Sequence, residues 1–396
     1  MTNDKVLAGV KVLDFGRFIA GPFCAALLAD FGADVIRIDR LGGSEDRFIM
    51  PVTSDGEGAL FLQVNRNKRS ITLDLESNDG REILHRLLQG ADVVVANMPP
   101  RTMARLGLDY ASLCRIKPDI ILTASSAFGT HEAVRDRVGF DGVGQSISGA
   151  VRMAGTPEHP AKAMVPVVDF ATALSCALGT VMALYERRSS GRGQEVTSSL
   201  LHTALNLSSG LLIEEALLRL NRTASCNRSP NYGPSDIYRT RDGWIIVQVV
   251  GDGLFHRWVR LTGQQALLDD PRFQGDAARG EHGDVLSQIM QDWCASRTQA
   301  DALEALEQAR IPAGPVHSPR QTLDDPIVRE SGAFQQMPYP GAPEGVPIVV
   351  PPLSMSRTPP TISQRPPQAG EHTDAILLEA GYTAADVARL RARKVI

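Results

Sequence analysis

Short apolar runs and helical stretches alternate over the first 125 residues, and this alternation most limits what the chain can fold into. Strand candidates lie at residues 10–15, 34–39, 70–75, 91–97 and 119–125. Helical stretches lie among them, at residues 23–31, 79–89 and 102–106. Strands that alternate with helices form parallel sheets covered on both faces, so we predict an α/β fold with a doubly wound, Rossmann-like sheet.

The loops that follow the predicted strands are candidate binding loops, because ligands of doubly wound sheets sit beyond the carboxyl ends of the strands. These loops comprise residues 16–21, Asp39 with Arg40, and residues 97–101. A dinucleotide fold is the obvious competitor, since Asp39 ends a strand where a ribose-binding carboxylate would lie. The first loop reads GRFIAG, however, and lacks the G-x-G-x-x-G spacing that pyrophosphate binding requires.

Asp169 is the residue at which we expect the chemistry. It lies in the run VPVVDF, between a strand-like segment at 165–168 and a long small-residue helix predicted at 171–188. At a helix N-terminus, unpaired N–H groups and the helix dipole favour an ionised carboxylate, which keeps an aspartate nucleophilic. Aspartate is also an ordinary N-cap residue, so the local sequence alone leaves a purely structural role open.

The composition excludes several classes of function. The chain has 41 Lys and Arg against 45 Asp and Glu, with no basic run interleaved with aromatic residues, so we expect no nucleic-acid partner. The five cysteines are scattered without a CxxC pair, which is typical of reduced thiols in a cytoplasmic protein and indicates no metal site. The N-terminus lacks a leader-like segment and no run of 18 apolar residues occurs, so we expect no membrane partner.

The length of 396 residues exceeds the usual size of one hydrophobic core, so two domains are expected. A helical region, which we place from about Val196, is broken at residues 221–233 by Asn, Arg, Ser, Pro and Gly. We predict the N-terminal part of a large domain at 1–200, a helical linker at 201–225, a small α+β domain at 226–325, and a return segment at 326–396.

Local signals mark elements within the second half. Asp242-Gly243 ahead of the apolar run 244–250 predicts a hairpin, and Thr298 with Asp301 predicts a helix start. The return segment is dense in proline from 338 to 367, which favours an extended strap. Two short helices are predicted after it, at 374–380 and 384–393.

Several short motifs, taken in order, cover the chain from end to end. They are LAGVKVLD at 7–14 with AGP at 20–22, FGADVIRIDR at 31–40, NRNKRS at 65–70, RLGL at 105–108, GFD at 139–141, Asp169, RSSGRGQ at 188–194, YRT at 238–240 with DGW at 242–244, IPAGPV at 311–316 and GEHT at 370–373. This ordered set resembles the class III CoA-transferases, whose superfamily includes formyl-CoA and crotonobetainyl-CoA transferases and the 2-methylacyl-CoA racemases.

The resemblance implies a CoA-transferase in which Asp169 is the nucleophile. Its carboxylate would attack the thioester carbonyl of a donor, expected to be succinyl-CoA, giving an aspartyl anhydride and then an aspartyl-CoA thioester. A small organic acid would reverse these steps, and we expect a C4–C5 dicarboxylate such as itaconate or mesaconate. CoA thioesters are thus substrates, with no permanently bound cofactor, and the family implies an interlocked, ring-like homodimer.

The resemblance also implies a set of CoA contacts, in which arginine and lysine suit the phosphate groups. The candidates are Arg17, Phe18, Arg40, Lys68, Arg69, Asn97, Met98, Arg105 and Arg137. For a dicarboxylate acceptor, Arg47 or Arg228 is a candidate for holding the free carboxylate.

Two departures from the family patterns bear on the substrate. The racemases carry a histidine acid/base where this chain has Phe140, which cannot move a proton, although His131 and His159 lie nearby in the sequence. The oxalate-using transferases carry a run of glycines where residues 227–234 read NRSPNYGP, and proline stiffens such a loop. A racemase and a non-catalytic CoA-binding protein are therefore the alternatives to a transferase.

Overall fold

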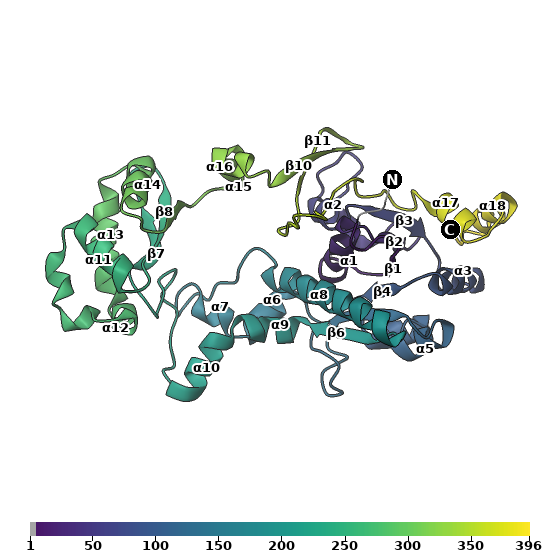
Figure 1. Cartoon of the computed structure of the whole chain (residues 1–396), viewed down its shortest axis with the longest axis horizontal. Helices are drawn as coiled ribbons and strands as arrows, with labels where there is room; N and C mark the ends of the chain where they lie inside the picture. The colour runs from purple at the N-terminus through teal and green to yellow at the C-terminus, as the bar shows by residue number, and fades with distance from the viewer. Residues whose placement is uncertain (1–4) are drawn as a thin grey trace. The chain divides into compact units, whose positions relative to one another are not determined.

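A six-stranded parallel sheet organises the first part of the chain in the computed structural model, which describes residues 5–396 (Figure 1). The strand order is β3-β2-β1-β4-β5-β6, and every neighbouring pair is parallel. The bounds are β1 Lys11–Asp14, β2 Asp34–Asp39, β3 Lys68–Thr72, β4 Val93–Ala96, β5 Ile121–Ser126 and β6 Glu195–Ser199. The predicted parallel α/β sheet is confirmed, and its order reverses between β1 and β4, where such sheets bind ligands.

Helices cover both faces of this sheet, because its central strands are apolar on both sides. Val12, Val93 and Ile121 are all fully buried. One core cluster joins the sheet to α1 and α8, and a second joins it to α3, α5, α17 and α18. The helices of this unit are α1 Ala20–Asp30, α2 Ala59–Val64, α3 Asn78–Gln89, α4 Pro100–Leu106, α5 Tyr110–Ile116, α6 Asp141–Ile147, α8 Val167–Ser190, α9 Leu200–Leu207, α17 Thr373–Glu379 and α18 Ala384–Ala392.

Two elements around Asp169 differ from the prediction. The segment at 165–168 forms no strand, and α8 begins at Val167, so Asp169 lies inside its first turn. The residues near Val196 that were expected to be helical form strand β6, which pairs with β5. Its sequence EVTSS carries β-branched Val and Thr, which suit an edge strand, and helix α9 begins only after it.

Helix α8 is long and apolar enough to cross a membrane by composition, with a mean hydropathy of 1.8. It packs against α1, β5 and β6, as the core helix of a sheet does. One helix of this kind is weak evidence for a membrane, and the expected absence of a membrane partner and the expected cytoplasmic location stay predictions.

A second compact unit comprises residues 149–162 and 213–332. It therefore extends beyond both ends of the small domain predicted at 226–325, and it also includes residues 149–162, which lie in the range predicted for the large domain. Strands β7 Ser235–Arg239, β8 Trp244–Gln248 and β9 Ala313–Pro315 form an antiparallel sheet in which β8 is central. Its helices are α7 Ala150–Met153, α11 Asp252–Thr262, α12 Asp276–Glu281, α13 Gly283–Ala295, α14 Gln299–Gln308, α15 Pro319–Asp324 and α16 Pro326–Glu330, while α10 Ser209–Leu218 runs from the first unit into this one.

The structure confirms the predicted hairpin and the predicted helix start in this unit. The hairpin at Asp242-Gly243 joins β7 to β8, and the Thr298 hydroxyl accepts the Asp301 N–H at the start of α14. The apolar side chains of the sheet and helices form a core of their own around the fully buried Trp258.

The proline-rich return segment, predicted as an extended strap, contains a regular element at its start. Strands β10 Phe334–Tyr339 and β11 Ala342–Val349 form an antiparallel hairpin, which packs on α2 through Met337, Tyr339 and Ile348. Proline is tolerated in an isolated two-stranded ribbon, because half of its N–H groups face no partner strand. The two predicted C-terminal helices are present as α17 and α18.

Candidate active site

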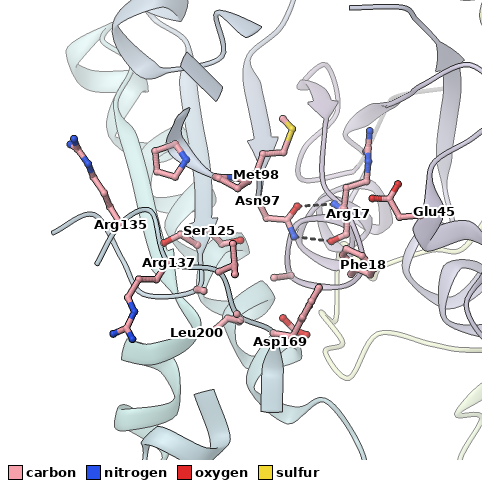
Figure 2. Close-up of a pocket in the computed structure, with 18 residues that line it drawn as sticks. Arg17, Phe18, Glu45, Asn97, Met98, Ser125, Arg135, Arg137, Asp169 and Leu200 are labelled. Atoms are coloured by element: carbon pink, nitrogen blue, oxygen red, sulfur yellow. Dashed lines mark hydrogen bonds between the residues drawn. The ribbon is translucent and has the colours of Figure 1, made fainter. Parts of the chain in front are cut away.

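A pocket of about 290 Å³ opens at the carboxyl ends of the parallel strands (Figure 2). It brings together loops that follow β1, β4 and β5, the segment before α6, and the starts of α8 and α9. Its lining consists of Arg17, Phe18, Ala20, Glu45, Asn97, Met98, Pro99, Pro100, Ser125, Ser126, Ala127, Arg135, Arg137, Val138, Gly139, Phe140, Asp169 and Leu200.

Asn97 holds the loop after β1 in place. Its side-chain oxygen accepts the Arg17 N–H at 2.7 Å, and its side-chain nitrogen donates to the Arg17 carbonyl at 2.7 Å, as the dashed lines in Figure 2 show. A side chain at Gly21 would meet the Gly16 Cα at 2.8 Å, so glycine is required there. The loops after β1 and β4, the strands at which the sheet order reverses, are thus fastened together.

Arg17 itself points its guanidinium at backbone oxygens. It donates to the carbonyls of Phe15, Gly16 and Ile38 at 2.8–3.2 Å. Burial, and secondarily the nearby Arg37, lower the pKa of Arg17 from its usual value. Among residues 5–396 no carboxylate is hydrogen-bonded to this cation, but Asp39, Asp46 and Asp14 lie close enough to oppose the lowering of its pKa.

Behind the pocket lies a buried group of paired charges, which we call the ion-pair cluster. Its members are Asp14, Arg37, Asp39, Asp46, Arg47 and Lys68, all 3% exposed or less. Burial alone would raise the pKa of Asp39, but Arg37 and Arg47 outweigh it and hold that pKa below its usual range. Asp46 also accepts the N–H of Phe18, whose φ of +63° is unusual for a residue other than glycine. The cluster thereby holds the pocket loop in a strained conformation.

Two candidate residues belong to this cluster and not to the pocket. The Lys68 ammonium lies 2.7 Å from Asp14 and also donates to Pro22 and Asn65, and burial lowers its pKa to about 8. Arg47 binds Asp39 and Glu57. The assignments of Lys68 to CoA and Arg47 to an acceptor carboxylate are therefore withdrawn, because both side chains are paired with buried carboxylates and neither lines the pocket.

Three further candidates lie outside the pocket. Arg69 binds Asp34 and Glu379 at 2.7 and 2.8 Å and lines a separate cavity near the amino ends of β1 and β2. Arg105 pairs with Glu76 at the surface. Arg40 pairs with Glu45, and Glu45 lines the pocket, so Arg40 is at its edge.

The structure places Asp169 on the pocket wall, close to a second carboxylate. Asp141 accepts the N–H of Val168 at 2.7 Å and the N–H of Asp169 at 3.1 Å. Burial, followed by repulsion from Asp141, raises the pKa of Asp169 to about 7. This overturns the expectation that the helix N-terminus would favour the ionised form, because Asp141 occupies the N–H groups of that turn.

Sequence reasoning found six lining residues and missed others. Arg17, Phe18, Asn97, Met98, Arg137 and Asp169 are all brought together as predicted. Ser125 and Ser126 end β5, so the rule applied to the other strands would have found them. Arg135 was missed although it lies in the same segment as Arg137, and Leu200 was missed because β6 was read as helix.

The remaining wall is aromatic and cationic. Phe140 and Phe18 meet edge to face at a centroid distance of 5.3 Å, although Phe140 remains 64% exposed. Arg137 lies over the Phe128 ring, and Arg135, in the same segment of the chain, is exposed. No histidine or cysteine belongs to this lining, and the described part of the chain contains no cluster of metal ligands. A carboxyl group beside apolar walls and unpaired cations is equipped for acyl transfer on an anionic substrate.

Comparison with known proteins places the chain among acyl-CoA enzymes. The model of CoA-transferase family III matches residues 7–373. The chain is 34% identical to succinyl-CoA--D-citramalate CoA-transferase of Chloroflexus aurantiacus, over 99% of this chain and 98% of the relative. It is 31% identical to succinyl-CoA:mesaconate CoA-transferase of Haloarcula hispanica, over 95% and 96%. A solved CaiB/BaiF family protein from Brucella suis is similar with a TM-score of 0.83 at 29% identity, over 95% of this chain and 99% of that one.

Proposed function

The chain belongs to CoA-transferase family III and is a CoA-transferase, and from this we propose that it moves CoA from succinyl-CoA to a small dicarboxylic acid. The substrate class is supported by the names of the two relatives, which pair succinyl-CoA with D-citramalate and with mesaconate. The observation that carries the reaction is the position of Asp169, a carboxyl group on the wall of a pocket at the carboxyl ends of the sheet.

In the proposed reaction, Asp169 attacks the thioester carbon of succinyl-CoA, the C–S bond breaks, and CoA leaves as the thiolate. The thiolate attacks the Asp169 carbonyl of this anhydride, which forms an aspartyl-CoA thioester and releases succinate. The acceptor carboxylate repeats both steps in reverse, leaves as its CoA ester, and regenerates the Asp169 carboxylate. A carboxylate nucleophile needs no general base, which is compatible with a lining free of histidine.

We propose that the nucleotide part of CoA lies over the loops after β1 and β4. Arg17 supports this placement through its position in the lining and its positive charge, while its terminal nitrogens stay bound to backbone carbonyls. Arg137 is a second cation of the lining. Phe18, Asn97 and Met98 would contact the rest of the ligand, with Arg40 at the edge.

For the free carboxylate of the acceptor we propose Arg135 in place of Arg47. Arg135 lines the pocket as an exposed cation, and no ion pair to it is found within residues 5–396. Arg135→Ala should raise the KM of the acceptor more than the KM of succinyl-CoA. An unchanged acceptor KM would contradict the assignment. Arg228 belongs to the second unit and stays a candidate.

We also propose that the protein is a homodimer in which α8 is covered by the second copy. Leu174, Leu178, Met182 and Tyr185 form a stripe along α8 and are 47–75% exposed. Their spacing places them on one face, and an apolar face of this kind is typical of a protein interface. Leu178→Asp should shift the mass measured by light scattering from dimer to monomer, whereas a monomeric wild-type protein would refute the proposal.

The test of the proposed function is mass spectrometry of CoA esters in D2O, with succinyl-CoA, a 2-methylacyl-CoA and a panel of free acids. New CoA esters that require Asp169 would support the transferase and identify the acceptor. Deuterium at the α-carbon without exchange of CoA would support a racemase instead. CoA binding without either signal would favour the non-catalytic alternative, and Asp169→Asn is the matched control in each case.

A further inference from the structure

We propose that Asp141 is a positioning residue for Asp169, which fixes the first turn of α8 through two N–H groups and opposes the negative charge of the nucleophile with its own. The inference rests on the proposed function, since it concerns the step in which Asp169 becomes acylated. It concerns a residue that approaches Asp169 through its backbone, so Asp141 itself need not touch the substrate.

The local sequence of α8 cannot fix its own N-terminus. Pro166 is the N-cap residue, and no side chain at that position accepts a hydrogen bond from the helix. Asp141 supplies the missing acceptor from a point 27 residues earlier, where its Oδ2 binds the N–H groups of Val168 and Asp169. Two such bonds to an anion orient the turn that carries the nucleophile.

Asp141 is itself held in place. It is the first residue of α6 and only 8% exposed, and its Oδ1 accepts a hydrogen bond from the side chain of Gln145. Gln145 in turn accepts the N–H of Ala163 at 2.9 Å. A Cβ at Gly144 would lie 3.2 Å from Val168, so α6 and α8 are in close contact here. The carboxylate is therefore locked between two elements.

Repulsion between Asp141 and Asp169 should favour the reaction, because it raises the pKa of Asp169 before the attack. Arg17, Arg135, Arg137 and Glu45 also line the pocket, yet apart from burial the charge that raises the pKa of Asp169 is that of Asp141. A more basic carboxylate is a stronger nucleophile. When Asp169 forms the anhydride, its negative charge passes to the CoA thiolate, so the repulsion present before the attack is relieved in both covalent intermediates.

The experiment compares pH profiles of kcat/KM for succinyl-CoA in the wild type, Asp141→Asn and Asp141→Glu. Asn keeps an acceptor for the two N–H groups but removes the charge, so the acidic limb of the profile should move to lower pH by about one unit or more. Glu keeps the charge and should keep the limb near its wild-type position. Asp109→Asn is the matched control, because Asp109 caps α5 away from the pocket and its loss should leave the limb unchanged.

An unshifted limb in Asp141→Asn, with the rate lowered equally at every pH, would show that Asp141 is only a helix cap and would overturn the inference. If Asp141→Asn does not fold, as judged by circular dichroism, Asp141→Ser removes the charge with a smaller acceptor. A wild-type limb near pH 4 would also overturn it, because no charge would then be acting on Asp169. Failure of the wild type to exchange CoA with any acid would refute the proposed function instead, so the two failures are distinct.

Discussion

The ion-pair cluster and the pocket are both rich in charge, but they use it in opposite ways. In the cluster each cation lies within hydrogen-bond distance of a carboxylate, and the side chains are almost fully buried. In the pocket, Arg135 and Arg137 have no carboxylate partner among the described residues, and the Asp169 carboxylate is repelled by the nearby Asp141. The paired side chains of the cluster therefore stabilise the loops, whereas the unpaired arginines of the pocket can bind an anionic ligand.

Replacing Asp169, the proposed nucleophile, should have the largest effect of the changes that test this contrast. Asp169→Asn keeps the shape of the side chain but removes the anion that attacks the thioester, so CoA exchange should fall by about three orders of magnitude or more. CoA-ester formation followed by mass spectrometry measures the loss, and calorimetric CoA binding should be retained. Exchange within tenfold of the wild type would mean that another residue is the nucleophile.

Breaking a pair within the cluster should damage stability instead of chemistry. Lys68→Met leaves Asp14 buried without its cation, and the loss of one partner of a buried pair costs about 3–5 kcal/mol. The free energy of unfolding, measured with urea, should fall by this order. Arg105→Ala, at an exposed pair, is the control and should change stability little. A stable Lys68→Met with lost CoA binding would return Lys68 to the set of ligand contacts.

Removal of a charge without a partner should act on binding. Arg137→Ala should raise the KM of succinyl-CoA about tenfold, the scale of one charge-assisted hydrogen bond, and leave the unfolding free energy unchanged. Arg69→Ala should lower the unfolding free energy and leave the KM of succinyl-CoA unchanged, because Arg69 is paired with Asp34 and Glu379. Equal KM values for the two variants would remove Arg137 from the binding site.

The pH dependence of activity should follow Asp169. A carboxyl group with a pKa of about 7 is mostly protonated below that pH, and a protonated carboxyl is not a nucleophile. kcat/KM should therefore fall about tenfold for each unit below pH 6. Initial rates at constant ionic strength from pH 5 to 9 measure this, and a flat profile down to about pH 5 would contradict it.

The smallest effect is on stability at neutral pH. The raised pKa means that folded Asp169 binds its proton more tightly than the unfolded chain does, so its contribution to stability decreases as pH rises from about 4 to 7. Asp169→Asn removes this cost and should stabilise the protein by about 1 kcal/mol at pH 8, after allowance for solvent screening. Melting curves of both proteins should show a larger difference at pH 8 than at pH 5, and the difference should vanish only below about pH 4.

The elements that could be predicted from the sequence are those that depend on residues close together in the chain. Apolar runs gave β1 to β5, and short-range turn and cap signals gave the β7–β8 hairpin and α14. The edge strand β6 was missed because its hydrogen bonds come from β5, which lies far away in the chain. The partner of Lys68 and the cap of α8 were missed for the same reason, since both depend on contacts across 54 and 27 residues.

The two hydrogen bonds between the Asn97 side chain and the Arg17 backbone fix the loop after β1 before any ligand binds. A side chain 80 residues away already satisfies both backbone groups of Arg17, so this loop loses its conformational entropy during folding and not during binding. On the proposed placement of CoA, the ester meets a surface that is shaped in advance. Its residence time is set by the contacts that it breaks on leaving, and turnover need not wait for this loop to order itself.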